Sequence, residues 1–298
     1  MTETLSSLGH QNLAGTGHEL EIVMIDDGSK DRTVEIAEAM RAQLPAQLKI
    51  VKQQNGRVCR ARNHGFEVSQ GDFIAWCDHD DVWHPDKLRL QMQVLHEHPE
   101  YGMVNSHFVR WEEGANGTHP PQAELLPRHV DTTLDASLSG WTYTELLYDI
   151  YVLTSTSLMR RSLANATGPW NEKLPYAEDW EYWIRASRHT QFAQLLAPLV
   201  LYRMHRANGS RMVREKNWAE DVFANALGEW GLAAPDGKLA DAKRVNLTRA
   251  RNWYYHGHAN LNGGSSEIAR QSLWNAWRMV PTHKGFMIDF MRSLLSWR

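Results

Sequence analysis

The chain has 298 residues, of which 42% are hydrophobic and 22% are charged, and its formal net charge is -3. These values suit one large globular domain or two smaller ones, and they exclude the basic balance that is typical of general nucleic-acid binders. We find no apolar run near the roughly 20 residues that span a bilayer, and no signal peptide at the start. Because Cys59 and Cys77 fall in segments typical of buried thiols, we expect a cytoplasmic protein without a disulfide.

Short strands alternate with helices in the first part of the chain. We expect strands at Glu21–Ile25, Leu48–Gln53 and Phe73–Cys77, with helices over residues 31–44 and 60–70 between them. This alternation predicts an α/β fold with a doubly wound, mostly parallel sheet. Ligands of such sheets bind beyond the carboxyl ends of the strands.

Two acidic clusters follow expected strands, DDGS at residues 26–29 and DHDD at residues 78–81. Carboxylates this close repel one another, and partial desolvation increases the repulsion unless a cation or hydrogen-bond donors offset it. Mg²⁺ and Mn²⁺ take oxygen ligands and bridge to phosphates, so DHDD suits a metal-bound diphosphate. Taken alone, DHDD is equally well explained by Asp80 or Asp81 favouring the dipole of the helix that begins near Pro85. DDGS taken alone is mostly a turn, in which Gly28 permits a positive φ and Ser29 or Asp31 caps the next helix.

The following segments continue the pattern. A helix is expected to begin near Pro85, and the polar stretch Trp111–Pro127 is expected to be a long surface loop. We then expect a strand at Thr154–Arg160, a helix over residues 177–189 and a strand over residues 195–205. The remainder, residues 211–298, is expected to be helical apart from turns at residues 235–237 and 262–264.

Five motifs occur in a fixed order: EIVMIDDGSKDRT, NGRVCRARNHG, GDFIAWCDHDDVWHPDKL, AEDWEYWIRAS and PLVLYRMHRANGS. As an ordered set, covering about Leu20 to Ser210, they resemble family 2 glycosyltransferases with the A-type nucleotide-sugar fold, which is Rossmann-like. The resemblance implies a catalytic domain at residues 1–210 and a helical C-terminal extension at residues 211–298. It also implies an inverting transfer of a sugar from a nucleotide-diphosphate donor to an acceptor hydroxyl.

The resemblance assigns roles to four aspartates. It implies that Asp27 holds the nucleobase, that Asp78 and Asp80 meet the ribose and a Mg²⁺ or Mn²⁺ ion, with Asp80 as the metal ligand, and that Asp179 is the general base. A base must take the proton of the acceptor hydroxyl as the new bond forms. A purely structural interpretation of AEDWEYWIRAS, without a catalytic role, is a helix whose acidic first turn is stabilised by the helix dipole.

Three further residues are weaker candidates. Glu178 would raise the pKa of its neighbour by charge repulsion or would hydrogen-bond the acceptor, and the sequence leaves both open. The resemblance places Arg203 and His205 near the donor phosphates. A planar guanidinium suits a pair of diphosphate oxygens, so Arg203 is the stronger of the two phosphate candidates.

The N-terminus departs from the family pattern. Members usually begin with a strand and a loop that lines the nucleobase pocket. This chain begins instead with MTETLSSLGHQNLAGTGHELEIV, which corresponds to the helix that follows that strand. Leu5, Leu8 and Leu13 are expected on the buried face of this helix. Loss of that strand would expose the edge of its neighbour and remove one wall of the pocket. We expect that the recorded start at Met1 is too late. The competing interpretation is a true start with impaired donor binding.

The aromatic tail allows two interpretations. In the interpretation that we favour, its apolar helix faces pack on each other or on the catalytic domain. In the other, the segment ending at Trp297 and Arg298 lies on an anionic membrane surface. The expected partners are a nucleotide-diphosphate sugar and a glycan or lipid-linked acceptor in bacterial cell-surface polysaccharide or glycoconjugate assembly. The protein would then work in the cytoplasm or at the inner face of the membrane. A non-catalytic sugar-nucleotide-binding or scaffolding protein is the main alternative, and a phosphohydrolase is disfavoured because its acidic pair would follow the first strand.

Overall fold

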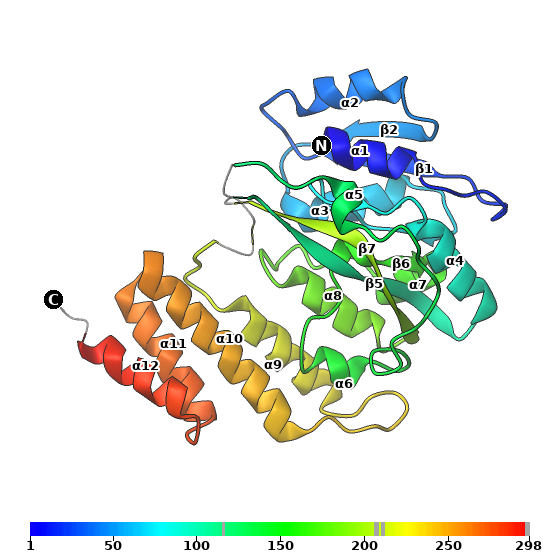
Figure 1. Cartoon of the computed structure of the whole chain (residues 1–298). Coiled ribbons are helices and arrows are strands. Elements are labelled where there is room, and N and C mark those ends of the chain that lie inside the picture. The colour runs from blue at the N-terminus through cyan, green and yellow to red at the C-terminus, as the bar shows by residue number, and fades with distance from the viewer. Residues whose placement is uncertain (115–116, 206–208, 210–211, 296–298) are drawn as a thin grey trace. The chain divides into compact units, whose positions relative to one another are not determined.

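The computed structural model describes residues 1–114, 117–205, 209 and 212–295 (Figure 1). The chain forms two compact units. Unit 1 consists of residues 1–142, 151–173 and 185–205, and Unit 2 consists of residues 143–150, 174–184 and 206–298.

Unit 1 begins with a small parallel sheet between helices. Its elements are α1 (Thr2–Gly9), β1 (Glu21–Asp26), α2 (Thr33–Arg41), β2 (Gln47–Lys52) and α3 (Arg57–Val68). β1 and β2 pair in parallel, with Ile22 opposite Leu48. α1 and α2 bury one face of this sheet in an apolar cluster that includes Leu5 and Ala37. α3 covers the other face, and the contact is close because Gly65 presents no side chain to Ile25 (Figure 1).

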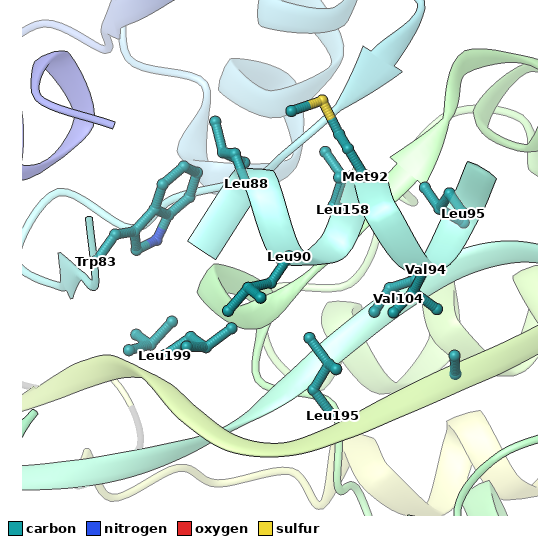
Figure 2. Close-up of a cluster of buried hydrophobic side chains, with 12 residues drawn as sticks. Trp83, Leu88, Leu90, Met92, Val94, Leu95, Val104, Leu158, Leu195 and Leu199 are labelled. Atoms are coloured by element: carbon teal, nitrogen blue, oxygen red, sulfur yellow. The ribbon is translucent and has the colours of Figure 1, made fainter. Parts of the chain in front are cut away.

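The larger sheet of Unit 1 has the strand order β3-β6-β5-β7-β4. Its strands are β3 (Phe73–Ile74), β4 (Val82–Trp83), β5 (Tyr101–Glu112), β6 (Leu158–Arg160) and β7 (Gln191–Met204). α4 (Lys87–Glu97) packs on it through buried side chains such as Leu95 and Val94, which lie near Val104 of β5 (Figure 2). The remaining short helices of Unit 1 are α5 (Gln122–Leu125), η1 (Thr154–Thr156) and α7 (Arg161–Thr167).

The α/β class is confirmed, but the pairing of the strands is mixed. Parallel pairing is found between β1 and β2 and between β5 and β7, while β3–β6, β5–β6 and β4–β7 are antiparallel. The longest pairings are parallel, and the antiparallel ones involve the short strands β3, β4 and β6. The mixed order of the larger sheet was not predicted because β5 was not identified from the sequence. It enters the sheet between β6 and β7, where β6 runs against it. Part of the loop expected from Trp111 belongs to the end of this strand.

Unit 2 is helical, as expected for the C-terminal region. Its helices are α6 (Tyr143–Leu146), most of α8 (Glu178–Ala186), α9 (Trp218–Trp230), α10 (Ala242–Gly263), α11 (Ser266–Met279) and α12 (Lys284–Leu295). The indole nitrogen of Trp180 donates to the Leu146 carbonyl at 2.6 Å, and its ring meets Phe223 edge-on. Ala250, Ala276 and Phe286 form an apolar cluster that joins the last three helices.

The expected packing of the tail helices on each other is therefore observed. α12 also exposes Met287, Ile288, Met291 and Leu294. Trp297 and Arg298, which we connected with a membrane surface, lie outside the described residues. Within the part of the chain that the structure describes, every helix is too short or too polar to cross a membrane.

Candidate donor site

Asp78 is held by an arginine from a different element. After β3 the chain leaves the sheet, and the Asp78 carboxylate accepts a hydrogen bond of 2.9 Å from Arg62 on α3. The Arg62 guanidinium also stacks on Trp170, 4.3 Å from the ring centroid, and its side chain is only 11% exposed. The Asp78 amide donates to the Ser155 hydroxyl at 3.0 Å. Asp78 is thus a fixed carboxylate that retains 34% of its side-chain exposure.

Asp80 meets a histidine from the end of β7. Its Oδ2 lies 2.8 Å from Nε2 of His205, and both side chains are partly buried. Arg203, two residues earlier, donates through Nε to the Asp80 carbonyl at 2.9 Å and contacts Glu3 at 2.7 Å. Its guanidinium also lies 4.0 Å from the centre of the Trp111 ring. Arg203 therefore holds the main chain at Asp80 in place.

Asp81 differs from the other two aspartates because it is fully buried. Burial, together with the charges of Asp78 and Asp80, raises its pKa to about 8. Its Oδ1 accepts the Arg203 amide at 3.1 Å, while Oδ2 has no hydrogen-bond partner among the described residues. Asp81 is consequently protonated near neutral pH and adds little negative charge to the cluster.

Asp27 joins the end of β1 to the start of α3. Its carboxylate accepts hydrogen bonds from Gln53 at 2.7 Å, from the Gly56 amide at 2.8 Å and from the Arg57 amide at 2.9 Å. The last two donors belong to the amino end of α3, where a negative charge is favourable. Arg57 has a φ of 71°, an uncommon conformation for a residue with a side chain. Asp27 thus has a structural role whether or not a ligand is present.

Asp27 and Asp78 line the same cavity of Unit 1, which has a volume of about 900 Å³. Arg62, His79 and Asp26 also line it, and Asp26 is buried with its carboxylate accepting the Ser29 amide at 3.0 Å. Asp27 and Asp78 lie beyond the carboxyl ends of β1 and β3, whereas Glu21 and Asp72 line the cavity at the amino ends of the same strands. The rest of the lining is largely apolar.

Glu178 and Asp179 belong to Unit 2, in the first turn of α8. Both are half-buried, and Asp179 accepts a hydrogen bond of 2.8 Å from the Trp180 amide. Ala177, directly before them, has a φ of 60°, and its carbonyl accepts the Glu181 amide at 3.1 Å. The helix therefore begins from a strained residue, and strain of this kind is concentrated at functional sites.

The residues that the structure brings together in Unit 1 can supply part of a metal site. Asp80 and His205 offer an oxygen and a nitrogen, donors that Mn²⁺ accepts in proteins. Within the described ranges, no group of three or more His, Cys, Asp or Glu side chains is arranged to hold a metal ion. Asp80 and His205 thus offer two ligand atoms, and a cation held by them would take its other ligands from water or phosphate oxygens.

Two residues of this site were missed from the sequence. Arg62 lies within NGRVCRARNHG, a motif quoted for its resemblance, but nothing in the letters shows which arginine faces Asp78. Asp81 was considered as a helix cap, whereas it is buried beneath the cluster. A signal for Arg62 was available in principle, since a carboxylate run near a strand end requires a cation or donors nearby.

The family model of glycosyl transferase family 2 matches residues 1–149, half of the chain. The chain belongs to this family. A relative of this family 2 chain, the poly(ribitol-phosphate) beta-N-acetylglucosaminyltransferase TarS of Staphylococcus aureus, is 25% identical over 224 residues, which are 75% of this chain and 36% of TarS. The chain spans about a quarter to two fifths of the length of the first curated relatives it matches.

Solved structures support the fold. A crystal structure of TarS residues 1–349 in complex with UDP-GlcNAc matches with a TM-score of 0.61 at 22% identity, covering 94% of this chain and 77% of that one. A mannosyltransferase from Pyrobaculum calidifontis, in complex with GDP-Man and Mn²⁺, matches with a TM-score of 0.58 at 16% identity, covering 98% and 79%. The A-type glycosyltransferase fold expected from the motifs is confirmed.

Proposed function

We propose that this protein is an inverting glycosyltransferase that moves a sugar from a nucleoside-diphosphate donor to an acceptor hydroxyl. The observation that carries the proposal is the pairing of Asp78 with Arg62 and of Asp80 with His205, at the carboxyl ends of strands in a family 2 fold. Two polar pairs placed there, beside a cavity that also takes in Asp27, suit a ligand with ribose and phosphate groups.

Each residue of Unit 1 has a proposed role toward the donor. Asp27 is assigned to the nucleobase and Asp78 to the ribose hydroxyls. Asp80 and His205 would hold Mg²⁺ or Mn²⁺, which when bound supplies positive charge to the departing diphosphate. Arg203 is assigned to the phosphates, and its hydrogen bond to the Asp80 carbonyl makes it a positioning residue for the metal ligand as well.

We assign proton removal to Asp179. Inversion is a single displacement, in which the acceptor hydroxyl attacks the anomeric carbon from the face opposite the diphosphate and loses its proton to a base. Asp179 is a half-buried carboxylate at a helix start, two residues after Ala177, whose φ of 60° is unusual for a residue with a side chain. Glu178 is assigned to support of Asp179 or to an acceptor hydroxyl. The site then needs no covalent enzyme intermediate.

The donor and acceptor are proposed from chemistry and from the names of similar proteins. Because TarS is described with UDP-GlcNAc, a UDP-linked sugar is the first donor to test, and a GDP-linked sugar is the second. We propose a glycan or lipid-linked acceptor in cell-surface polysaccharide assembly in the cytoplasm. The exposed apolar side chains of α12, Met287, Ile288, Met291 and Leu294, would allow peripheral contact with a membrane during this reaction.

Donor turnover tests the proposed function. The protein is incubated with UDP- and GDP-sugars and Mn²⁺, and release of the nucleoside diphosphate is measured with and without polyol-phosphate and oligosaccharide acceptors. We expect release that requires one nucleotide and Mn²⁺, and a product whose anomeric configuration, read by NMR, is opposite to that of the donor. Retention of configuration would refute the single displacement. Tight donor binding without turnover by any acceptor would favour the alternative, a non-catalytic sugar-nucleotide-binding protein.

A further inference from the structure

A fully buried lysine lies at the start of α4. Lys87 has no exposed surface, and its amino group stands over the Trp83 ring, 3.9 Å from the ring centre. Among the described residues, no carboxylate forms an ion pair with this amine, although lysine is almost never fully buried unless it is paired. Burial lowers the pKa of Lys87 to about 7, so an amine at this position costs folding free energy at neutral pH. Such a cost points to a role beyond packing.

The Lys87 amine is held by two acceptors from different segments. Its Nζ donates to Oε1 of Gln91, one turn later on α4, at 2.9 Å and to the Ser157 carbonyl at 3.3 Å. Gln91 is also fully buried, and its Nε2 donates to the Thr156 carbonyl at 2.7 Å and to the Val104 carbonyl at 3.1 Å. The two side chains of α4 thus supply donors to consecutive carbonyls at the end of η1.

η1 and the residue after it form a polar segment in the interior of Unit 1. All four residues from Thr154 to Ser157 are buried, and their side chains all carry hydroxyl groups. Buried polar groups require hydrogen-bond partners, and a buried network loosens when one of its members is removed. Replacement of Lys87 or Gln91 would take donors away from buried carbonyls of this segment.

The same segment holds the main chain of Asp78. The hydroxyl of Ser155, in the middle of η1, accepts the Asp78 amide at 3.0 Å, while Arg62 holds the Asp78 carboxylate. Trp83, the ring beneath the Lys87 amine, belongs to β4, which directly follows the acidic run at residues 78–81. The contacts of Lys87 and Gln91 therefore lead to both ends of that run.

We propose, on the basis of the proposed function, that Lys87 and Gln91 are positioning residues of the donor site. Through η1 and Ser155 they fix the main chain at Asp78, and with it the direction of the carboxylate that is assigned to the ribose hydroxyls. Neither Lys87 nor Gln91 lines the cavity, so neither touches the donor there. A misplacement of about 1 Å is enough to weaken the action of a positioned group strongly. The effect of the α4 pair on donor binding therefore passes through Asp78.

Amide hydrogen exchange tests this coupling without any nucleotide. Lys87→Met keeps the length of the side chain but removes the amine, and Gln91→Met is a second variant that keeps the test open if the first does not fold. Lys49→Met is the matched control, because exposed Lys49 also donates to a main-chain carbonyl, that of Val68. We expect exchange in the segments 76–80 and 153–158 to be at least about fivefold faster in both α4 variants and unchanged within β1.

Nucleotide binding tests whether the coupling reaches the ribose. Calorimetric titration compares the nucleoside diphosphate that binds the natural protein with its 2′,3′-dideoxy form, which lacks the ribose hydroxyls. We expect Lys87→Met to weaken the affinity for the ribose form by about tenfold and that for the dideoxy form by less than about twofold. Lys49→Met should change neither affinity.

Two results would overturn the proposal. One is exchange of residues 76–80 at the natural rate in both α4 variants. The other is an equal change of affinity for the two nucleotides, because Lys87 would then support the packing of Unit 1 in general and not Asp78 in particular. A natural protein that binds no nucleotide would refute the proposed function instead, and the exchange rates would still decide whether the α4 pair holds Asp78.

Discussion

Arg62 and Asp78 form a hydrogen-bonded ion pair of 2.9 Å between α3 and the end of β3. Because the guanidinium is also stacked on Trp170, it is held in one place before any donor arrives. Asp78 in turn is aimed into the cavity that Asp27 shares. The pair therefore connects the packing of Unit 1 with the geometry of the proposed ribose site.

The first prediction concerns this pair. Replacement of Arg62 by Met keeps much of the stacking volume on Trp170 but leaves Asp78 without its cation. We expect a loss of about 1 kcal/mol in the free energy of unfolding and a donor affinity reduced by about tenfold. Urea denaturation and calorimetric titration with the nucleotide measure the two effects. The exposed Arg60→Met variant is the matched control, and equal behaviour of both variants would contradict the assignment.

The second prediction concerns Asp80 and His205. Asp80→Asn keeps the main-chain carbonyl that accepts the Arg203 hydrogen bond, but it removes the negative charge beside the His205 imidazole. We expect affinity for the Mn²⁺–nucleotide to fall at least about tenfold, with a smaller change for the nucleotide in EDTA. His205→Gln should show the same pattern more weakly. Glu97→Gln, an exposed change on α4, should leave both affinities unaltered, and equal losses with and without metal would argue against a metal role.

The third prediction is a pH dependence of stability. The folded-state pKa of Asp81, about 8, lies above its usual value, so the folded protein binds more protons than the unfolded chain between about pH 4 and pH 8. The contribution of Asp81 to stability is therefore present at low pH and is lost as pH rises through about 8.

Asp81→Asn removes this dependence. We expect the variant to gain stability relative to the natural protein as pH rises from about 5 to about 9, because it has no carboxyl group to ionise in the buried position. The gain should be on the order of 2 kcal/mol, since relaxation of the site lowers the cost of burying the charge. Urea denaturation in EDTA at several pH values measures the difference. Parallel stability profiles for the two proteins would show that Asp81 titrates normally.

The fourth prediction separates chemistry from binding. Asp179→Asn should reduce kcat by about 10²- to 10⁴-fold while the affinity for the donor stays within about twofold. Glu181→Gln, in the same first turn of α8, removes an equal charge from the helix start and serves as the control. A similar kcat for Asp179→Asn and the natural protein would mean that another group takes the proton.

The sequence predicted those features of the fold that depend on residues close together in the chain. The apolar runs predicted the positions of β1 and β2. The aspartates at the ends of β1 and β3 predicted that carboxylates lie at those strand ends. The sequence did not predict features that depend on contacts between residues far apart in the chain. β5 carries Asn105 and Ser106 at buried positions, which breaks an apolar strand pattern. That polarity is tolerated because the Asn105 amide donates to Gln194, its register partner on β7.

Site residues show the same limit. Asp78 and Asp80 could be chosen as candidates from their position after a strand, but the partners that orient them come from α3 and from the residue after β7. The burial of Asp81 also depends on elements far along the chain, since Arg203 supplies its hydrogen bond. No local pattern encodes such long-range contacts.

Thermal unfolding with nucleotides tests the central claim most directly, because a ligand that binds only the folded state raises its apparent stability. The protein is heated with UDP or GDP, in Mn²⁺ or in EDTA. The account predicts a rise in Tm with one nucleoside diphosphate that requires Mn²⁺ and is lost in Asp80→Asn. Absence of a shift with every nucleotide, with and without Mn²⁺, would contradict a nucleotide-sugar site at Asp78 and Asp80.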